Sequence, residues 1–310
     1  MTNVLPLFQY PTTIAWVDDD EIFLQSIDLI FQGNKKIFSN PNECIAYFNV
    51  NKPFSQIAFL HGESNNESYD SLEHAPVDFD VTELAGLHNH AERFQEISVL
   101  ICDHNMPEMT GLNLCCKLRD FPVKKILLTG EMQNEEAVQA FNTGLIERFI
   151  HKYNLNLPTE IPKYITDLTR QYFSELTRPI LLHLEADRVL PLSDPAFIAF
   201  FDKWCDDNNI KEFYLIDKQG SFLTTNDKNG MHYFVIHTDW SLNNFAKFYS
   251  DNAEVKSLIQ LVETRSKIPF FGYKKDAWQV NHSEWAKYFY VPDILEGREK
   301  YYWKVIEVDF

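Results

Sequence analysis

The chain of 310 residues lacks the features that define several large classes of protein. No segment approaches the roughly 18 consecutive apolar residues that a membrane-spanning helix needs. The N-terminus has no basic segment followed by an apolar stretch, so no secretory signal is predicted. The five cysteines are odd in number and show no Cys-x-x-Cys spacing of a metal site. We therefore expect a cytoplasmic protein with reduced thiols and no membrane partner.

Basic charge is also scarce. The net charge is −17, and residues 1–159 carry 22 acids and 10 bases, against 23 acids and 18 bases in residues 160–310. Neither half offers the basic surface that dominates affinity for DNA. A DNA-binding function is therefore disfavoured, and it would need a local cluster such as Lys267, Lys274, Lys275 and Lys287.

The marks of common enzymes are missing as well. The sequence contains no Gly-Gly-Asp-Glu-Phe stretch, no His-Asp dyad, no Walker loop and no His-Glu-x-x-His motif. Enzymatic chemistry in the second half would need converging polar residues in a cleft. Asp217, His232 and His237 are the candidates for such a group.

What the first half does contain is a regular alternation of strand-like and helix-like segments. The strands are predicted at Thr13–Val17, Lys36–Ser39, Ile97–Cys102, Lys125–Thr129 and Arg148–His151. Helices are predicted between them, at Asp20–Gln32, Pro41–Phe48, Gly111–Arg119 and Asn134–Asn142. This alternation indicates an α/β fold, with a doubly wound, five-stranded parallel sheet and helices on both faces.

Polar side chains follow four of these strands at the point where each strand ends. Asp18 and Asp19 follow the first strand, Asp103 the third, Thr129 closes the fourth and Lys152 follows the fifth. The carboxyl ends of neighbouring parallel strands lie at one edge of a sheet, so these groups are expected to converge in a single pocket.

Together with Asn105, Met106, Pro107 and Gly111 after Asp103, this order of residues resembles the CheY-like receiver domain of two-component response regulators. The resemblance covers residues 12–152 apart from one insertion and implies a flavodoxin-like strand order. It implies that Asp103 accepts a phosphoryl group from a histidine kinase or a phosphotransfer protein. It also implies a Mg²⁺ site of Asp18, Asp19, Asp103 and the backbone carbonyl of Asn105, which suits a cation that prefers oxygen ligands.

The same resemblance assigns four switch residues. Lys152 would pair with Asp103 or with its phosphoryl oxygens, and Thr129 would donate its hydroxyl to a phosphoryl oxygen. Gly130 would leave room for the phosphate, and Phe149 would be the aromatic residue that changes position on phosphorylation. One departure is that Tyr153 follows the lysine where the family often has a cis proline.

Residues 51–96 interrupt the alternation with an insertion of roughly 45 residues, rich in acids. A capping signal near Thr82 predicts a helix over about 81–95 that packs on a sheet or on a partner. We place the receiver domain at residues 1–158 and a closing or connector helix at 159–180. In that helix Tyr164, Leu168, Tyr172 and Leu176 form one apolar seam.

Residues 181–310 predict an α+β output domain with an antiparallel sheet. Three strands, Glu212–Ile216, Ser221–Thr225 and His232–His237, are joined by short turns as a meander. Helices are expected at about 241–250 and 252–265, and a last strand at 301–308. Eleven aromatic residues between 270 and 303 either fill a core or line a binding surface.

These observations predict a response regulator whose receiver catalyses its own phosphoryl transfer and dephosphorylation without being a conventional enzyme. The apolar seam and Phe149 favour a homodimer promoted by phosphorylation, and a protein or small ligand is favoured over nucleic acid as the output partner. The alternatives are a DNA-binding transcriptional regulator and an output domain with enzymatic activity. The late position of Asp103 is similar to that in response regulators of Legionella-type α-hydroxyketone quorum sensing.

Overall fold

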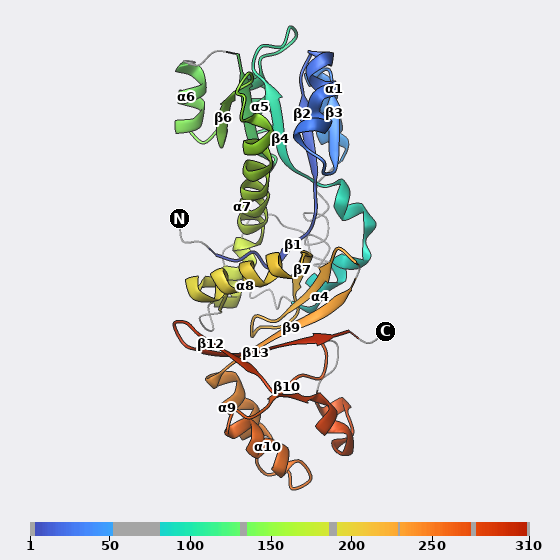
Figure 1. Cartoon of the computed structure of the whole chain (residues 1–310), viewed down its shortest axis with the longest axis vertical. Coiled ribbons are helices and arrows are strands. Elements are labelled where there is room, and N and C mark those ends of the chain that lie inside the picture. Colours follow the sequence, from blue (N-terminus) through green and yellow to red (C-terminus); the bar gives the residue numbers. More distant parts are fainter. Residues whose placement is uncertain are drawn as a thin grey trace, which may run out of the picture. The chain divides into compact units, whose positions relative to one another are not determined.

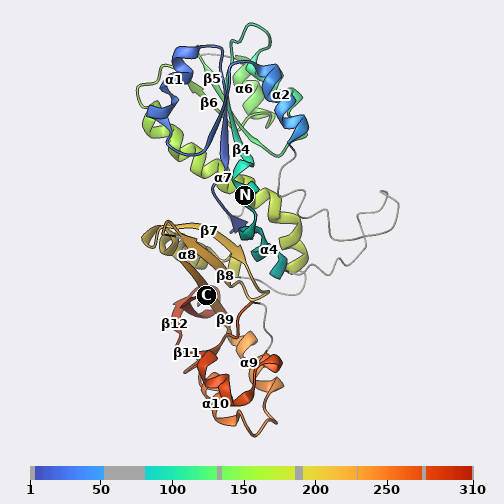
Figure 2. The ribbon, with the colours of Figure 1, turned by 90° about the vertical axis from the view of Figure 1, so that its right-hand side faces the viewer.

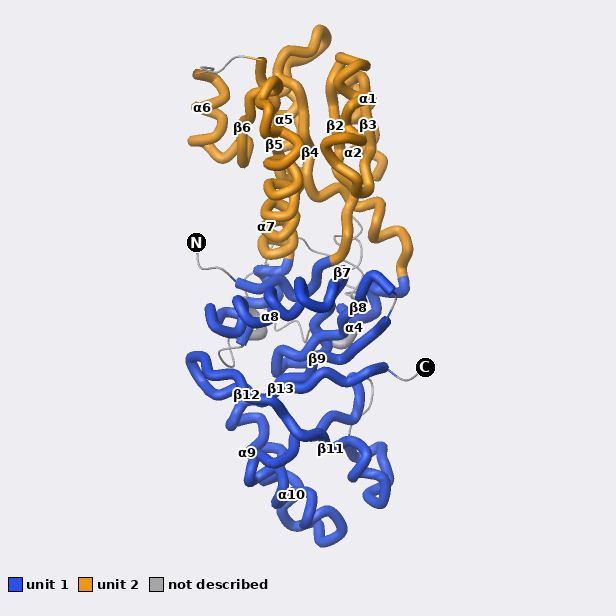
Figure 3. The backbone as a smooth tube through the Cα atoms, viewed as in Figure 1, with its two compact units in different colours: residues 1–9, 76–89, 177–310 blue, residues 10–75, 90–176 orange. Residues whose placement is uncertain are grey.

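The computed structural model describes residues 4–51, 81–130, 135–185, 191–228, 230–273 and 277–308. The chain forms two compact units, which Figure 3 shows in different colours. Unit 1 comprises residues 1–9, 76–89 and 177–310, and unit 2 comprises residues 10–75 and 90–176. The chain therefore passes from one unit to the other four times.

Unit 2 is built on a five-stranded parallel sheet (Figure 1). Its strands are β2 (Thr13–Val17), β3 (Lys35–Phe38), β4 (Ile97–Asp103), β5 (Lys124–Thr129) and β6 (Arg148–His151). Their order in the sheet is β3-β2-β4-β5-β6, and every neighbouring pair is parallel. The flavodoxin-like sheet expected from the sequence is therefore confirmed.

Helices cover both faces of this sheet (Figure 2). Helices α1 (Glu21–Ile30) and α7 (Leu157–Glu185) pack on one face, and α2 (Pro41–Val50), α5 (Gly111–Lys117) and α6 (Glu135–Asn142) pack on the other. The central strands β4 and β5 are therefore buried at every position, whereas the edge strands β3 and β6 keep exposed residues.

Side-chain caps fix where the helices that face the sheet begin. Asp20 accepts backbone N–H groups of Ile22 and Phe23 at the start of α1, and Thr110 accepts that of Asn113 at the start of α5. These caps satisfy helix N–H groups that have no partner within the helix. They set the directions in which α1 and α5 leave the strand ends.

Helix α7 is longer than the sequence predicted, and its apolar seam has a different role. Leu168 and Tyr172 are each 1% exposed, and Leu168 belongs to the apolar cluster between the sheet, α1 and α7. The hydroxyl of Tyr172 donates to the buried carboxylate of Glu96, which also accepts from the hydroxyl of Tyr10 at 2.5 Å. Leu168 and Tyr172 of the seam thus pack inside unit 2 and do not support a homodimer.

Lys124 and Lys125, at the start of β5, are both buried. We expect their substitution to change the stability of the protein in opposite directions. The ammonium of Lys124 lies 2.5 Å from Glu175 and 3.4 Å from Glu147, whereas that of Lys125, within the described part of the chain, donates only to the carbonyl of Val123, at 3.2 Å. Burial lowers the pKa of Lys125 although Glu147 partly opposes it. The folded protein therefore binds fewer protons here than the unfolded chain does, and stability rises with pH between the lowered pKa and the ordinary one.

We expect Lys125→Met to raise the free energy of unfolding by about 1–2 kcal/mol at neutral pH, because it removes a poorly paired buried charge. The gain should shrink at alkaline pH. Lys124→Met is the matched control and should lower stability by about 1 kcal/mol, since it leaves Glu147 without its cation. Urea denaturation at two pH values measures both, and equal losses in the two variants would contradict the difference in pairing.

Unit 1 contains a six-stranded antiparallel sheet in the order β1-β7-β8-β9-β13-β12. Its strands are β1 (Phe8–Gln9), β7 (Ile210–Leu215), β8 (Phe222–Asn226), β9 (Met231–Thr238), β12 (Asp293–Glu296) and β13 (Lys300–Glu307). The predicted meander is confirmed as β7-β8-β9. A second, two-stranded sheet pairs β10 (Ile268–Pro269) with β11 (Phe289–Tyr290).

Helices cover the two faces of the larger sheet with different side chains. Phe234 and Trp303 face α8 (Pro195–Asp207), where Phe200 contacts both rings. The alternate residues Val235 and Tyr302 belong to the apolar cluster of α9 (Asp239–Phe248) and α10 (Lys256–Glu263). Many of the aromatic residues between 270 and 303 therefore fill this core, including Phe271, Trp285, Phe289 and Tyr302.

Two segments of unit 1 come from outside the C-terminal half. Strand β1 forms one edge of the six-stranded sheet and pairs with β7, with Phe8 opposite Tyr214. Helix α4 (Thr82–Gly86), from the insertion, packs against the same strand. The single helix expected over 81–95 is instead α4 followed by 3₁₀ helices at Leu87–Asn89 and Ala91–Gln95, because Gly86 favours a helix end. The contiguous boundaries expected from the sequence therefore differ from the observed units.

No helix among the described residues is long and apolar enough to cross a membrane.

Candidate functional site

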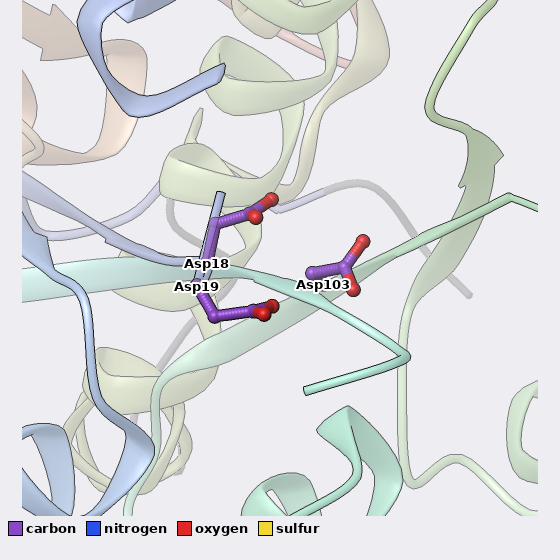
Figure 4. Close-up of side chains that lie close together, drawn as sticks. All are labelled: Asp18, Asp19 and Asp103. Atoms are coloured by element: carbon purple, nitrogen blue, oxygen red, sulfur yellow. The ribbon is translucent and has the colours of Figure 1, made fainter. Parts of the chain in front are cut away.

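Three carboxylates gather at the carboxyl edge of the parallel sheet in unit 2 (Figure 4). Asp18 and Asp19 follow the last residue of β2, and Asp103 ends the neighbouring strand β4. One ligand oxygen from each lies within 4.8 Å of the others. The convergence predicted from the strand ends is thus observed in the described residues.

Hydrogen bonds from the backbone orient two of these carboxylates. The N–H of Asp20 donates to Oδ1 of Asp18 at 2.9 Å, and the N–H of Asn105 donates to Oδ2 of Asp103 at 2.8 Å. Asp18 and Asp103 are nearly buried, at 1% and 6% exposure, whereas Asp19 is exposed. The site therefore offers oriented oxygens on its inner side and one solvent-facing carboxylate.

Lys152 reaches the same carboxylates from the end of β6. Its Nζ lies 2.8 Å from Oδ2 and 2.9 Å from Oδ1 of Asp18, and 3.3 Å from Oδ1 of Asp103. The sequence predicted pairing with Asp103, and the structure adds a closer pairing with Asp18. The backbone N–H of Lys152 donates to the carbonyl of Thr129 at 2.9 Å, and no cis peptide bond occurs in the described chain.

Burial and charge act on these groups in opposite directions. Burial raises the pKa of Asp18, although the Lys152 ammonium and the N–H of Asp20 oppose this. Burial alone would lower the pKa of Lys152, but the carboxylates of Asp18 and Asp103 outweigh it and hold the pKa above its ordinary value. Lys152 is therefore charged at neutral pH and balances one of three negative charges.

The other predicted switch residues lie on or directly after β5 and β6. Thr129 is 2% exposed at the end of β5. Among the described residues, a Cβ on Gly130 would meet only the Tyr153 ring, at 4.0 Å. Phe149 is 38% exposed, and its ring packs edge-on against that of Phe141, with centroids 6.2 Å apart.

Two contributors to the site were not assigned a role from the sequence. A Cβ on Gly111 would lie 2.3 Å from the carbonyl oxygen of Asp103, so only glycine allows α5 to start this close behind β4. Phe23, on α1, places its ring under the ammonium of Lys152, 4.7 Å from the ring centroid. Gly111 is one of the residues that carry the sequence resemblance, but its contact with Asp103 and the contact of Phe23 with Lys152 are seen only in the folded chain.

Of the three polar candidates in the second half, Asp217 and His237 interact electrostatically, whereas His232 faces the other way. The carboxylate of Asp217 accepts three backbone N–H groups of its own turn, at 2.9–3.0 Å. His237 bonds to Ser241 and to the carbonyl of Pro269, and burial lowers its pKa. His232 lies five residues earlier on the same strand, so its side chain points to the opposite face. Lys274 and Lys275, of the candidate basic cluster, lie outside the described residues.

The donor set of the acidic pocket suits a hard divalent cation. Carboxylate oxygens are the ligands that Mg²⁺ prefers, and three carboxylates with one ammonium leave an excess of two negative charges. Asp18, Asp19 and Asp103 would hold such an ion, with Asn105 as the predicted backbone ligand. Receiver domains generally bind Mg²⁺ at a pocket of this kind.

Comparisons with known proteins agree with this geometry. The family described as response regulator receiver domain matches residues 72–157, a range that includes Asp103, Thr129 and Lys152. The structure of the Legionella pneumophila response regulator LqsR superposes with a TM-score of 0.80 and 26% identity, covering 100% of this chain and 91% of that one.

Other solved structures match over shorter lengths. An adenylate cyclase from Rhodopirellula baltica matches with a TM-score of 0.38 and 21% identity, over 56% of this chain and 97% of that one. The receiver domain of the Francisella response regulator 1452 gives a TM-score of 0.34 and 14% identity, over 52% and 98%. A comparison with curated proteins gave no match.

Proposed function

This chain carries a CheY-like receiver domain of the response-regulator type, and from this premise we propose that it accepts a phosphoryl group on Asp103. A receiver domain implies a phosphodonor such as a histidine kinase. The observation that supports the proposal most is the position of Asp103 beside two further carboxylates and the ammonium of Lys152.

The transfer follows from the groups in the pocket. A carboxylate oxygen of Asp103 attacks the phosphorus of a phosphohistidine, the phosphorus–nitrogen bond breaks, and the imidazole leaves with the electron pair. Bound Mg²⁺ supplies neutralisation of the phosphoryl charge. Lys152 pairs with a phosphoryl oxygen as a point charge, and the hydroxyl of Thr129 donates to another. Attack of water on the acyl phosphate returns Asp103 to its carboxylate.

Phosphorylation would change the surface around Phe149. Once Thr129 turns toward the phosphoryl group, the ring of Phe149 can move inward, which alters the face formed by α6, β6 and α7. That face carries a hollow lined by Phe141, Arg148, Phe149, Ile150 and Tyr164. Phe141 and Phe149 expose 48% and 38% of their surface, so the face offers apolar area for a homodimer.

For the output domain, placed at residues 181–310 after the connector at 159–180, we propose a protein or small-ligand partner in the cytoplasm. Trp240, Phe248 and Trp278 of unit 1 are 45%, 80% and 72% exposed. Exposed aromatic side chains are typical anchors of binding surfaces. A role in quorum sensing stays a prediction of the sequence resemblance.

Size-exclusion chromatography with light scattering tests the proposal. Wild type with Mg²⁺ and beryllofluoride, a mimic of the phosphoryl group, is expected to elute at about twice the monomer mass or with a changed shape. Asp103→Asn should not respond. A wild-type protein that neither binds Mg²⁺ nor changes its elution would contradict the proposed switch.

A further inference from the structure

A phenyl ring lies under the ammonium of Lys152. The Nζ atom is 4.7 Å from the ring centroid of Phe23, and the lysine side chain is only 10% exposed. An ammonium over the face of an aromatic ring is attracted by the negative charge of the π face, and the attraction grows as water is excluded. The described contacts of this ammonium are therefore the ring and the carboxylates of Asp18 and Asp103.

The loop after β2 places this ring through two consecutive turns. The carboxylate of Asp18 accepts the N–H of Asp20, and the carboxylate of Asp20 accepts the N–H groups of Ile22 and Phe23, at 2.9 and 3.2 Å. Asp18 of the acidic pocket is thus bonded to Asp20, whose side chain fixes the first turn of α1. The position of the Phe23 ring is set by hydrogen bonds that begin at Asp18.

The ring differs from the other contacts of Lys152 in one respect. Asp18 and Asp103 are the groups that a bound cation would engage, so the carboxylates that hold the ammonium are shared with the metal. The ring of Phe23 has no oxygen that could bind the metal, so a bound cation does not compete for it. Lys152 can therefore keep its contact with Phe23 when Asp18 and Asp103 turn to bind the cation.

We infer that Phe23 is a positioning residue that holds the ammonium of Lys152 where a phosphoryl group on Asp103 arrives. The inference rests on the proposed function and adds a residue to it. The ring touches neither the metal nor the phosphoryl group, and it acts by limiting the positions of a flexible side chain. Lys152 is thereby ordered for phosphoryl binding before the donor docks.

The test is beryllofluoride binding by isothermal titration calorimetry at saturating Mg²⁺, together with the rate of phosphorylation by acetyl phosphate. Phe23→Leu keeps the apolar bulk and removes the ring. We expect it to weaken beryllofluoride binding about fivefold, which is about 1 kcal/mol, and to slow phosphorylation by a similar factor. The affinity for Mg²⁺ alone should change by less than about twofold. Phe23→Tyr retains the ring and should restore both values.

Phe31→Leu is the matched control, because Phe31 lies at the end of the same helix and packs partly buried on the same apolar cluster. It should lose similar stability in thermal denaturation and leave beryllofluoride binding unchanged. Equal beryllofluoride affinities in Phe23→Leu and Phe31→Leu would overturn the inference, as would a parallel loss of Mg²⁺ affinity in Phe23→Leu. A wild-type protein that takes no beryllofluoride would overturn the proposed function itself.

Discussion

Asp103→Asn is expected to abolish the acyl phosphate. The amide that replaces the carboxylate is not a nucleophile toward phosphorus, and no other described carboxylate has the position of Asp103 beside both Asp18 and Lys152. The variant should fold, because the amide oxygen can still accept the N–H of Asn105 that the carboxylate accepts at 2.8 Å.

Incubation with acetyl phosphate and Mg²⁺, followed by intact-mass measurement, checks this expectation. The control is Asp28→Asn, which makes the same chemical change at an exposed position of α1, where the side chain is 71% exposed. The control should phosphorylate at the wild-type rate. A stable phosphoryl group on Asp103→Asn at the wild-type rate would place the acceptor elsewhere and contradict the assigned chemistry.

Lys152→Met should slow phosphorylation by about 100-fold, the usual effect of removing one preorganised group that stabilises transition-state charge. The same change removes the cation that balances Asp18, whose side chain is 2% exposed. Leaving a buried carboxylate without its partner should lower the free energy of unfolding by about 3 kcal/mol without Mg²⁺. Added Mg²⁺ should recover part of this loss, because it binds the folded state.

The stability loss in Lys152→Met should depend on pH. Burial already raises the pKa of Asp18, and without the ammonium this pKa rises further. A raised carboxyl pKa means that the folded state takes up protons, so the deficit should shrink as the pH falls through that pKa. In wild type, the raised pKa of Lys152 makes the pair stabilising below the ordinary lysine pKa, and this stabilisation is lost as pH rises through the folded value.

Urea denaturation at several pH values, with Mg²⁺ and with a chelator, separates these effects. Lys203→Met is the control, since Lys203 forms an exposed ion pair with Asp207 at 2.6 Å and such pairs contribute little. If the Lys152→Met protein is phosphorylated at the wild-type rate and keeps wild-type stability, the role assigned to Lys152 is wrong.

The sequence predicted most of unit 2 because its signals are local. Each strand of the parallel sheet is a short apolar run, and the polar residue at its end reaches the same edge as its neighbours. Helices α1, α2 and α5 carry their own side-chain caps. The meander β7-β8-β9 was found in the same way, since short turns force neighbouring strands to pair as antiparallel hairpins.

The errors concern segments whose role depends on distant partners. The apolar residues of the α7 seam recur every four positions, which indicates that one face of the helix is packed. This pattern does not say whether that face packs on a second chain or on the protein's own sheet. Leu168 and Tyr172 are buried by their own sheet and by the segment around Glu96. Similarly, a strand as short as β1 has no pattern of its own and is recognised only through its pairing with β7.

The sequence by itself determined the parallel sheet and the convergence of Asp18, Asp19 and Asp103 at its edge, because strand periodicity and the common edge of parallel strands are encoded by neighbouring residues. Only the tertiary structure decided that β1 and α4 belong to unit 1, that Lys152 pairs most closely with Asp18, and that Phe23 lies beneath it. These features depend on contacts between residues far apart in the chain. Such contacts are decided by side-chain packing and cannot be predicted from local sequence patterns.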